Sequence, residues 1–384
     1  MIENINFKKP ISIYVHFPFC VRKCLYCDFP SYADIDCLAR AYVNALLKEI
    51  ECKSQFLSNT YVYTIYFGGG TPSLLKSKYI SAIVEKLNES FDMSNISEFT
   101  IEVNPGTVDE KKLKTYKNIG IDRISIGLQS VNEDDLLKAG RVHTFNDFLN
   151  VMSYAQNVGF DNINIDLIFG FPWQTFDQWK NTIDTVIKIN PSHISCYDLK
   201  IEKNTQLFNL VKTGQYKELP DEVNRKMYYY ACEQITKCNY NHYEISNFAK
   251  PGCESKHNIV YWKTGEYVGF GSGSFSYLNR KRYGNINNVE RYISGIENNI
   301  NVIDEFEVLS LSDEAHEYAM MGFRLLEGID EIKFKSRFDI DFSLIYEENL
   351  KRLYEKGLIE KNINNIRLTK KGLDFANNVF MEFI

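Results

Sequence analysis

The sequence predicts an α/β fold: a partial (β/α)6 barrel of parallel strands, followed by a smaller C-terminal domain that is helical and winged-helix-like. Three observations support this expectation. Short β-rich runs alternate six times with segments of helical periodicity, as in proteins built on a parallel sheet. Glycines and polar residues follow the strands at the ends where parallel sheets place their sites. The composition also changes after Asn279.

The alternation extends over the first 200 residues. We expect strands over residues 11–17, 63–67, 99–103, 123–127, 163–169 and 193–199. The segments between them carry apolar residues at spacings of three and four, which predicts helices over residues 38–51, 78–87, 109–118, 145–158 and 177–189. Strands that alternate with such helices pair in parallel.

The last hundred residues have a different pattern. Residues 285–304 are charged and rich in Asn, and helical periodicity follows over 312–326 and 342–356. Residues 358–368 predict a β-hairpin followed by a helix. We therefore expect a first domain over residues 1–280, with its core at about 1–235, and a second domain over 281–384.

Composition excludes several classes of protein. A formal net charge of −6 argues against a sequence-independent grip on nucleic acid, which requires a basic face. The N-terminus lacks the apolar region of a signal peptide, and no stretch approaches the ~20 apolar residues of a membrane span. Six of the nine cysteines are scattered, as expected of reduced thiols. We expect a cytoplasmic protein that binds small molecules or proteins.

The most informative motif is the C-x3-C-x2-C triplet of Cys20, Cys24 and Cys27, directly after the first expected strand. Three thiolates can hold three irons of a cubane cluster and leave the fourth iron open to another ligand. Zinc is the alternative, because Cys24 and Cys27 have the spacing of a zinc half-site, and His16, Cys37 or a distant residue could complete it.

Further polar residues lie at the ends of the expected strands. The Gly68-Gly69-Gly70-Thr71 run exposes backbone amides to a polar ligand, although such a run is also a common tight turn. The side chains suited to ribose hydroxyls, an amino group and a carboxylate are Glu102, Gln129, Arg141 and Asp166. Each of these can equally be a hydrogen-bonded structural residue.

The segment HNIVYW, residues 257–262, is the second informative motif. Imidazole is a common axial ligand of haem iron, and the aromatic pair could flank a flat macrocycle. A histidine beside aromatic residues is also commonly a packed, hydrogen-bonded residue. The sequence alone does not decide whether His257 is a haem ligand or a packed structural residue.

Seven segments together resemble the radical S-adenosylmethionine (radical SAM) superfamily and, within it, the HemN/HemW branch, HemW proteins most of all. These segments are HFPFCVRKCLYCDF, YFGGGTPS, IEVNPG, IGLQS, IDLIFGFPWQT, HNIVYW and MGFRLLEGID. The resemblance implies that Cys20, Cys24 and Cys27 hold a [4Fe-4S] cluster whose fourth iron binds S-adenosylmethionine. The positions that match the family's S-adenosylmethionine contacts are Tyr14, Gly69, Gly70, Thr71, Glu102, Gln129, Arg141 and Asp166.

The two members of the branch imply different functions. Coproporphyrinogen III dehydrogenases of the HemN type carry a further cysteine where this chain has Phe29, and a longer segment before the cluster. HemW proteins share the HNxxYW signature and are haem chaperones, so the resemblance makes His257 the expected haem contact. It implies haem as cargo, haem-accepting apo-proteins, one of which can be membrane-bound, and an electron donor. Oxygen-independent coproporphyrinogen III dehydrogenase activity is the alternative.

Overall fold

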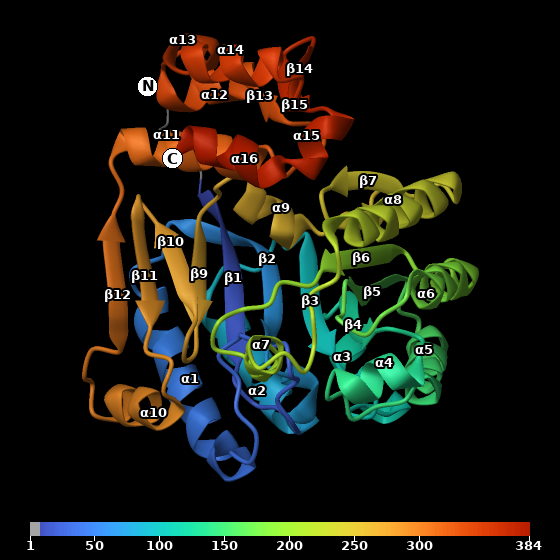
Figure 1. Cartoon of the computed structure of the whole chain (residues 1–384). Helices are drawn as coiled ribbons and strands as arrows, with labels where there is room; N and C mark the ends of the chain where they lie inside the picture. The colour runs from blue at the N-terminus through green and yellow to red at the C-terminus, as the bar shows by residue number, and fades with distance from the viewer. Residues whose placement is uncertain (1–7) are drawn as a thin grey trace, which may run out of the picture.

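Six parallel strands form the centre of the computed structural model, which describes residues 8–384 (Figure 1). They are β1 (Lys9–Phe17), β2 (Thr60–Gly69), β3 (Glu98–Val103), β4 (Arg123–Gln129), β5 (Asn162–Phe169) and β6 (His193–Asp198). Each pairs in parallel with the next along the chain, in the order β1 to β6. The prediction of six strand-helix units is confirmed.

Helices follow the strands, and most of them bury apolar side chains in the main hydrophobic core on one face of the sheet. They are α1 (Ala39–Ser54), α2 (Ser77–Ser90), α3 (Glu110–Asn118), α4 (Glu133–Lys138), α5 (Phe145–Val158), α6 (Phe176–Ile189), α7 (Gln206–Lys212) and α8 (Asp221–Lys237). Helix α1 shows why they pack there: Tyr42, Leu46 and Ile50, at four-residue spacing, are fully buried. The five predicted helices are confirmed; α4, α7 and α8 were not predicted.

The strands present apolar residues to these helices and polar residues to the barrel interior. In β1, Ile13 and Val15 are fully buried in the main hydrophobic core, whereas Ser12 lies on the opposite face and accepts a 2.7 Å hydrogen bond from Thr64 in β2. Because side chains of a strand alternate between its faces, this period-two pattern separates a dry outer layer from a polar interior.

The interior polar groups are paired with one another across the strands. Ser125 donates to Asp166 at 2.7 Å, and Asn164 donates to the same carboxylate at 2.9 Å. His193 lies 2.6 Å from the Asn164 amide oxygen and 2.8 Å from the Tyr243 hydroxyl. Hydrogen bonding of this kind is what makes a buried polar layer tolerable.

The amino-terminal end of the barrel is closed by α9 (Lys256–Trp262), which carries the HNIVYW segment. Glu98, the first residue of β3, accepts hydrogen bonds from the backbone amides of Lys256 at 2.9 Å and His257 at 3.2 Å. A carboxylate at these free amides compensates the positive end of the helix. The helix therefore forms the floor of the barrel.

The sheet extends beyond the predicted barrel at both edges. The added elements are β7 (Asn241–Glu244), β8 (Asn247–Ala249), β9 (Tyr267–Phe270), β10 (Phe275–Leu278), β11 (Lys281–Asn285), α10 (Val289–Glu297) and β12 (Ile303–Val308). The resulting twelve-stranded order is β12-β11-β10-β9-β1-β2-β3-β4-β5-β6-β8-β7. These short strands lack a periodic apolar pattern long enough to predict them.

This extension bears on the expected domain division. The predicted boundary between residues 280 and 281 falls in the turn between β10 and β11, which are antiparallel, hydrogen-bonded neighbours. Strand β12 in turn pairs with β11. We propose to place the boundary after β12 instead, because a second hydrophobic core begins with Ala315.

The C-terminal domain packs on the end of the sheet where β1 begins (Figure 1). Its elements are α11 (Leu311–Gly322), β13 (Ile329–Asp330), α12 (Glu331–Phe338), α13 (Phe342–Ile345), α14 (Glu347–Glu355), β14 (Ile359–Asn362), β15 (Asn365–Leu368), α15 (Lys370–Asp374) and α16 (Ala376–Phe380). The predicted hairpin is confirmed as β14 and β15, and β13 adds a third strand. Among the helices of residues 8–384, none combines the length and the apolar composition of a membrane span.

Helix α9 also anchors this domain. The Arg324 guanidinium lies 4.3 Å from the centre of the Trp262 ring, a cation–π contact. Arg337 donates to the backbone carbonyls of Lys263 at 3.0 Å and Thr264 at 2.9 Å. The HNIVYW segment thus joins the barrel floor to the second domain.

Four of the six histidines are buried and a fifth, His242, is half-buried, which predicts that the fold loses stability in acid. Burial lowers the pKa of His16, His143 and His242 to about 4, that of His257 to about 3, and that of His193 well below its usual value. Below about pH 6.5, the unfolded chain therefore binds more protons at these histidines than the folded protein does. The contribution of the neutral histidines to the free energy of unfolding is complete above about pH 6.5 and is lost as the pH falls toward 4.

His257→Asn tests this linkage. Each such histidine contributes up to about 1.4 kcal/mol per pH unit to the slope of the unfolding free energy. Between pH 6 and 4.5, we expect the variant's slope in chemical denaturation to be shallower by about 1 kcal/mol per pH unit. The control Tyr261→Phe keeps the imidazole and should retain the wild-type slope; equal slopes for all three proteins would contradict the prediction.

Candidate functional site

The three cysteines lie on one loop that leaves the carboxyl end of β1. The loop is held by the Cys20 amide, which donates to the Tyr32 carbonyl at 3.0 Å, and by a turn in which the Cys27 amide donates to the Cys24 carbonyl at 3.2 Å. All three thiols are half-buried, and burial raises the pKa of Cys20 and Cys27. The three thiols therefore lie on one short loop that backbone hydrogen bonds hold in place.

The glycine turn after β2 lies directly beside this loop. The Gly70 amide donates to the Phe17 carbonyl at 2.7 Å. A Cβ atom at Gly70 would lie 2.8 Å from the carbonyl oxygens of Phe17 and Phe19 and 3.0 Å from the Cys20 sulfur. No larger residue fits at this position. The sequence left open whether the glycine run is only a tight turn, and the structure shows that Gly70 allows the cysteine loop to approach the backbone closely.

A chain of polar contacts connects Cys20 with Cys24 through residues from three other loops. Thr71 Oγ1 lies 3.7 Å from the Cys20 sulfur and accepts a 2.8 Å hydrogen bond from the Asn104 amide. Arg141 donates to Asn104 Oδ1 at 2.5 Å and to the Cys24 sulfur at 3.6 Å. Cys24, Thr71, Asn104 and Arg141 also line a small cavity beside the cysteine loop.

Gln129 joins the same cluster through an irregularity in β4. The register between β4 and β5 shifts between Gly127 and Gln129, and Gln129 has a left-handed φ of 71°. A Cβ atom at Gly127 would lie 2.8 Å from Asn104 Oδ1, 3.0 Å from Gln129 Nε2 and 3.2 Å from an Arg141 nitrogen. Three polar side chains thus converge above Gly127.

Glu102 faces the glycine turn from β3. Its two carboxylate oxygens accept hydrogen bonds from the Tyr66 hydroxyl at 2.8 Å and the Gly69 amide at 3.1 Å. Burial raises the pKa of Glu102 to about 8, although the bond from Tyr66 lowers it. The carboxyl group is therefore largely protonated at neutral pH and can both donate to and accept from a ligand hydroxyl.

Tyr14 and Asp166 lie in the same interior layer. The Tyr14 hydroxyl is 3.0 Å from His16 Nδ1, and its ring stacks on Tyr66 with 6.3 Å between centroids. Asp166 is opposite Gly127 in the sheet register and is held by Ser125 and Asn164, as described above. The eight residues matched to S-adenosylmethionine contacts thus come from β1 to β5 and the loops that follow them.

Two residues of this cluster were not among the predicted site residues. Asn104 follows β3 directly, before a Pro-Gly turn, and the position of a polar residue at a strand end is a signal that could have identified it. Tyr66 lies within β2, and only the pairing with β3 shows that its hydroxyl reaches Glu102.

Cysteine thiolates are the donor type that iron–sulfur clusters use. Within residues 8–384, no three side chains of His, Cys, Asp or Glu lie close enough together to share one metal ion. A cubane does not need such a set, because each thiolate binds a different iron. His16 is also occupied, since Nε2 lies 2.7 Å from the Pro30 carbonyl oxygen and Nδ1 faces Tyr14. The zinc alternative that uses His16 is disfavoured.

The predicted role of His257 as a haem contact stays a prediction, and the structure shows the surroundings of this residue. Its side chain is 1% exposed in the barrel floor. Nδ1 lies 2.8 Å from Thr64 Oγ1, Nε2 lies 2.8 Å from the Tyr261 hydroxyl, and the ring stacks on Tyr66. Both nitrogens are therefore engaged. Alternation along β2 and the position of α9 enclose this imidazole inside the barrel.

Comparison with known proteins defines the family. A family model described as the radical SAM superfamily matches residues 14–186, and one described as the HemN C-terminal domain matches residues 309–375. The protein named heme chaperone HemW of Lactococcus lactis subsp. lactis is 34% identical over 98% of this chain and 98% of its own length. This chain belongs to the HemW family.

The similarity extends over several bacterial HemW proteins. That of Bacillus subtilis is 34% identical over 97% of this chain and 99% of its own, and that of Escherichia coli is 30% identical over 98% of both. Among solved structures, the coproporphyrinogen III oxidase HemN of Escherichia coli superposes with a TM-score of 0.85 over 98% of this chain and 90% of its own. Its sequence identity of 22% supports the shared fold alone.

Gly70→Ala tests the close approach beside the cysteine loop. The new methyl group would overlap two carbonyl oxygens and the Cys20 sulfur, so we expect anaerobically reconstituted protein to lose at least about half of its iron, by iron and sulfide analysis. The control Gly214→Ala lies in an exposed turn where a Cβ atom meets no atom within 4 Å, although its φ is +77°. Wild-type iron content in both variants would contradict the prediction.

Proposed function

We propose that this HemW family member is a haem chaperone that binds haem and transfers it to acceptor proteins. The observation that carries the proposal is the full-length similarity to several bacterial proteins named heme chaperone HemW, at identities of 30–34%. The HNIVYW segment supports it. Phe29, 61% exposed beside the cysteine loop, stands where the sequence resemblance places a further cysteine in HemN-type enzymes.

We propose that Cys20, Cys24 and Cys27 hold three corners of a [4Fe-4S] cluster and that S-adenosylmethionine takes the fourth. When bound, this pair supplies one-electron reductive chemistry at the sulfonium. The Arg141 guanidinium donates to the Cys24 sulfur and to the Asn104 side-chain oxygen. The Asn104 side-chain nitrogen in turn donates to the Thr71 hydroxyl and so fixes the position of the guanidinium. The amide of Gly69 donates to the carboxyl group of Glu102 at 3.1 Å, which fixes the glycine turn against β3.

The proposal includes partners and a compartment. All nine cysteines are free thiols, which fits the reducing cytoplasm. The cluster requires an electron donor, and the cargo requires haem-accepting apo-proteins, which can include a membrane-bound one. None of these partners involves nucleic acid, in keeping with the net charge of −6.

Serine substitutions in the cysteine loop test the cofactor. We expect about four iron and four sulfide per chain after anaerobic reconstitution, a severalfold loss in Cys20→Ser, Cys24→Ser and Cys27→Ser, and no loss in the control Cys52→Ser, whose thiol is exposed on α1. Added S-adenosylmethionine should change the electron paramagnetic resonance spectrum of the reduced wild-type cluster. Zinc in place of iron, or a spectrum indifferent to S-adenosylmethionine, would refute the cofactor proposal.

Oxidative decarboxylation of coproporphyrinogen III is the second candidate function, because the sequence also resembles the HemN type of the same branch. An anaerobic assay with S-adenosylmethionine, a reductant and coproporphyrinogen III separates the two. For a chaperone, we expect haemin titration to give a saturable Soret shift, transfer of bound haem to an apo-haemoprotein, and no sustained formation of protoporphyrinogen. Sustained product that disappears in Cys24→Ser would overturn the chaperone proposal.

A further inference from the structure

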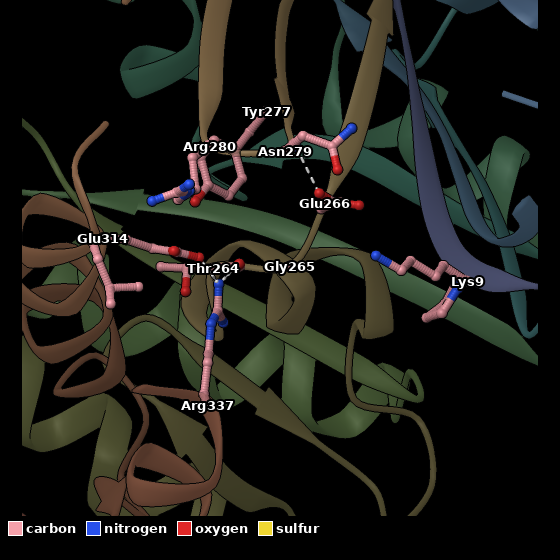
Figure 2. A pocket seen from close by; sticks show the side chains of 11 residues that line it. Lys9, Thr264, Gly265, Glu266, Tyr277, Asn279, Arg280, Glu314 and Arg337 are labelled. Carbon is pink, nitrogen blue, oxygen red and sulfur yellow. Dashed lines mark hydrogen bonds and ion pairs between the residues drawn. The ribbon is translucent and has the colours of Figure 1, made fainter. Parts of the chain in front are cut away.

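Two cavities of different chemistry lie at the two ends of β1. An interdomain cleft of about 550 Å³ lies between the barrel and the C-terminal domain, where β1 begins (Figure 2). Its walls come from the start of β1, the residues after α9, the β10–β11 turn and helices α11 and α12, and most of its side chains are polar or charged. Among residues 8–384, none that lines this cleft belongs to the cysteine loop, which borders the small cavity at the other end of β1.

Each thiol of the cysteine loop has a polar side chain beside its sulfur. Two of these side chains, Thr71 and Arg141, come from other loops and were described above. The third sulfur, that of Cys27, lies 3.9 Å from the hydroxyl oxygen of Ser31. Thr71 and Arg141 match S-adenosylmethionine contacts by resemblance, whereas Ser31 belongs to the cysteine loop itself and has no role assigned by the resemblance.

The Ser31 hydroxyl has two acceptors within reach. Ser31 is 1% exposed, and its hydroxyl donates to the Phe29 carbonyl at 3.3 Å in addition to facing the Cys27 sulfur. Hydrogen bonds to charged acceptors are shorter and stronger than those to neutral ones. A Cys27 thiolate bound to iron therefore attracts the hydroxyl proton more strongly than the Phe29 carbonyl does.

The residue before Ser31 is fixed by two other elements of the barrel. His16 Nε2, in β1, lies 2.7 Å from the Pro30 carbonyl oxygen, and because a carbonyl only accepts, this nitrogen carries the proton. The turn after β9 packs on the same proline, since a Cβ atom at Gly273 would lie 3.0 Å from Pro30 Cβ. Strand β9 pairs in parallel with β1, which places this turn at the edge of the cysteine loop.

The residue after Ser31 is fixed as well. The Tyr32 amide donates to the Pro18 carbonyl at 2.8 Å, and its own carbonyl accepts from the Cys20 amide at 3.0 Å. The Tyr32 hydroxyl donates to the Asn287 carbonyl, beyond β11, at 3.1 Å. Contacts on both sides of Ser31 thus hold its hydroxyl beside the cysteine sulfur.

We propose that the Ser31 hydroxyl donates a hydrogen bond to the iron-bound Cys27 thiolate and thereby raises the reduction potential of the cluster. The proposal rests on the proposed cofactor. Reduction adds one electron, from an external one-electron donor, and so one negative charge to the cluster and its sulfurs. A hydrogen-bond donor at a sulfur stabilises this more negative form, and such bonds are among the factors that set cluster potentials. Ser31 acts through Cys27 and is a positioning residue.

The position of Ser31 separates its effect from that of the other two donors. Because Ser31 lies in the same loop as Cys27, its hydrogen bond does not depend on a bound ligand. Thr71 and Arg141, by contrast, match positions that contact S-adenosylmethionine. The effect of Ser31 on the potential is therefore expected both with and without S-adenosylmethionine.

Removal of the hydroxyl tests the proposal. The full-length proteins are reconstituted anaerobically, and reduction by dithionite is followed by electron paramagnetic resonance at controlled potential, with and without S-adenosylmethionine. At a fixed potential, we expect the ratio of reduced to oxidised cluster to be about tenfold lower in Ser31→Ala than in wild type, which is 59 mV for one electron. Ser31→Thr keeps the hydroxyl and should stay within about twofold of the wild-type ratio.

The control is Ser192→Ala, which removes a buried hydroxyl just before β6, bonded to the Ile163 carbonyl at 2.9 Å. Its ratio should equal that of wild type. Equal ratios for wild type and Ser31→Ala, or a Ser31→Thr ratio as low as that of Ser31→Ala, would overturn the proposal.

Tyr32→Phe provides a second test with Ser31 intact. It removes only the hydroxyl that binds the Asn287 carbonyl, so we expect the ratio to fall in the same direction by about two- to threefold. Tyr229→Phe, which removes a hydroxyl bonded to Asp374 at 2.8 Å, should match wild type. If wild type holds the cluster and neither Ser31→Ala nor Tyr32→Phe changes the ratio, the Ser31 proposal is wrong while the cofactor stands. If wild type takes up no iron and sulfide, the proposed cofactor fails, and the role of Ser31 with it.

Discussion

The parallel pairing of β1 with β2 is the interaction on which the candidate site depends. Its register places Phe17 beside Gly69, so that the loop with three cysteines and the turn with three glycines leave the sheet at adjacent points. The hydrogen bond from the Gly70 amide to the Phe17 carbonyl then closes the distance between them. A side chain at Gly70 would separate the two loops, which is why the glycine is a structural requirement of the cysteine cluster.

The polar interior of the barrel follows from the same sheet geometry. Alternation in β1 to β6 gives the helices a continuous apolar surface and leaves serine, threonine, asparagine, histidine and carboxylate side chains inside. These groups satisfy one another in layers, from the Thr64 and His257 pair at the floor, through Tyr66 and Glu102, to the Gly69 amide at the site. The floor therefore supports the position of the glycine turn through a short series of contacts.

Helix α9 and the residues that follow it contact several parts of the molecule, and these contacts explain which residue types the segment contains. His257 faces the barrel interior, Trp262 stacks under Arg324 of the C-terminal domain, and the residues after the helix form one wall of the interdomain cleft. In the folded protein, the HNIVYW segment connects the barrel interior with the C-terminal domain. Strand β1 runs between two regions: the cysteine loop follows its carboxyl end, and its first residue, Lys9, lines the interdomain cleft.

The sequence by itself determined the six parallel strand-helix units and the late hairpin, because their apolar periodicity is long and regular. It also identified the cysteine loop, the glycine turn and the polar residues at the strand ends, since these signals are local. Only the tertiary structure decided the environment of His257, the hydrogen bonds by which Asn104 connects Thr71 with Arg141, and the pairing of β9 to β12 with the barrel. These depend on contacts between residues far apart in the chain, for which short strands and single polar side chains leave no periodic trace.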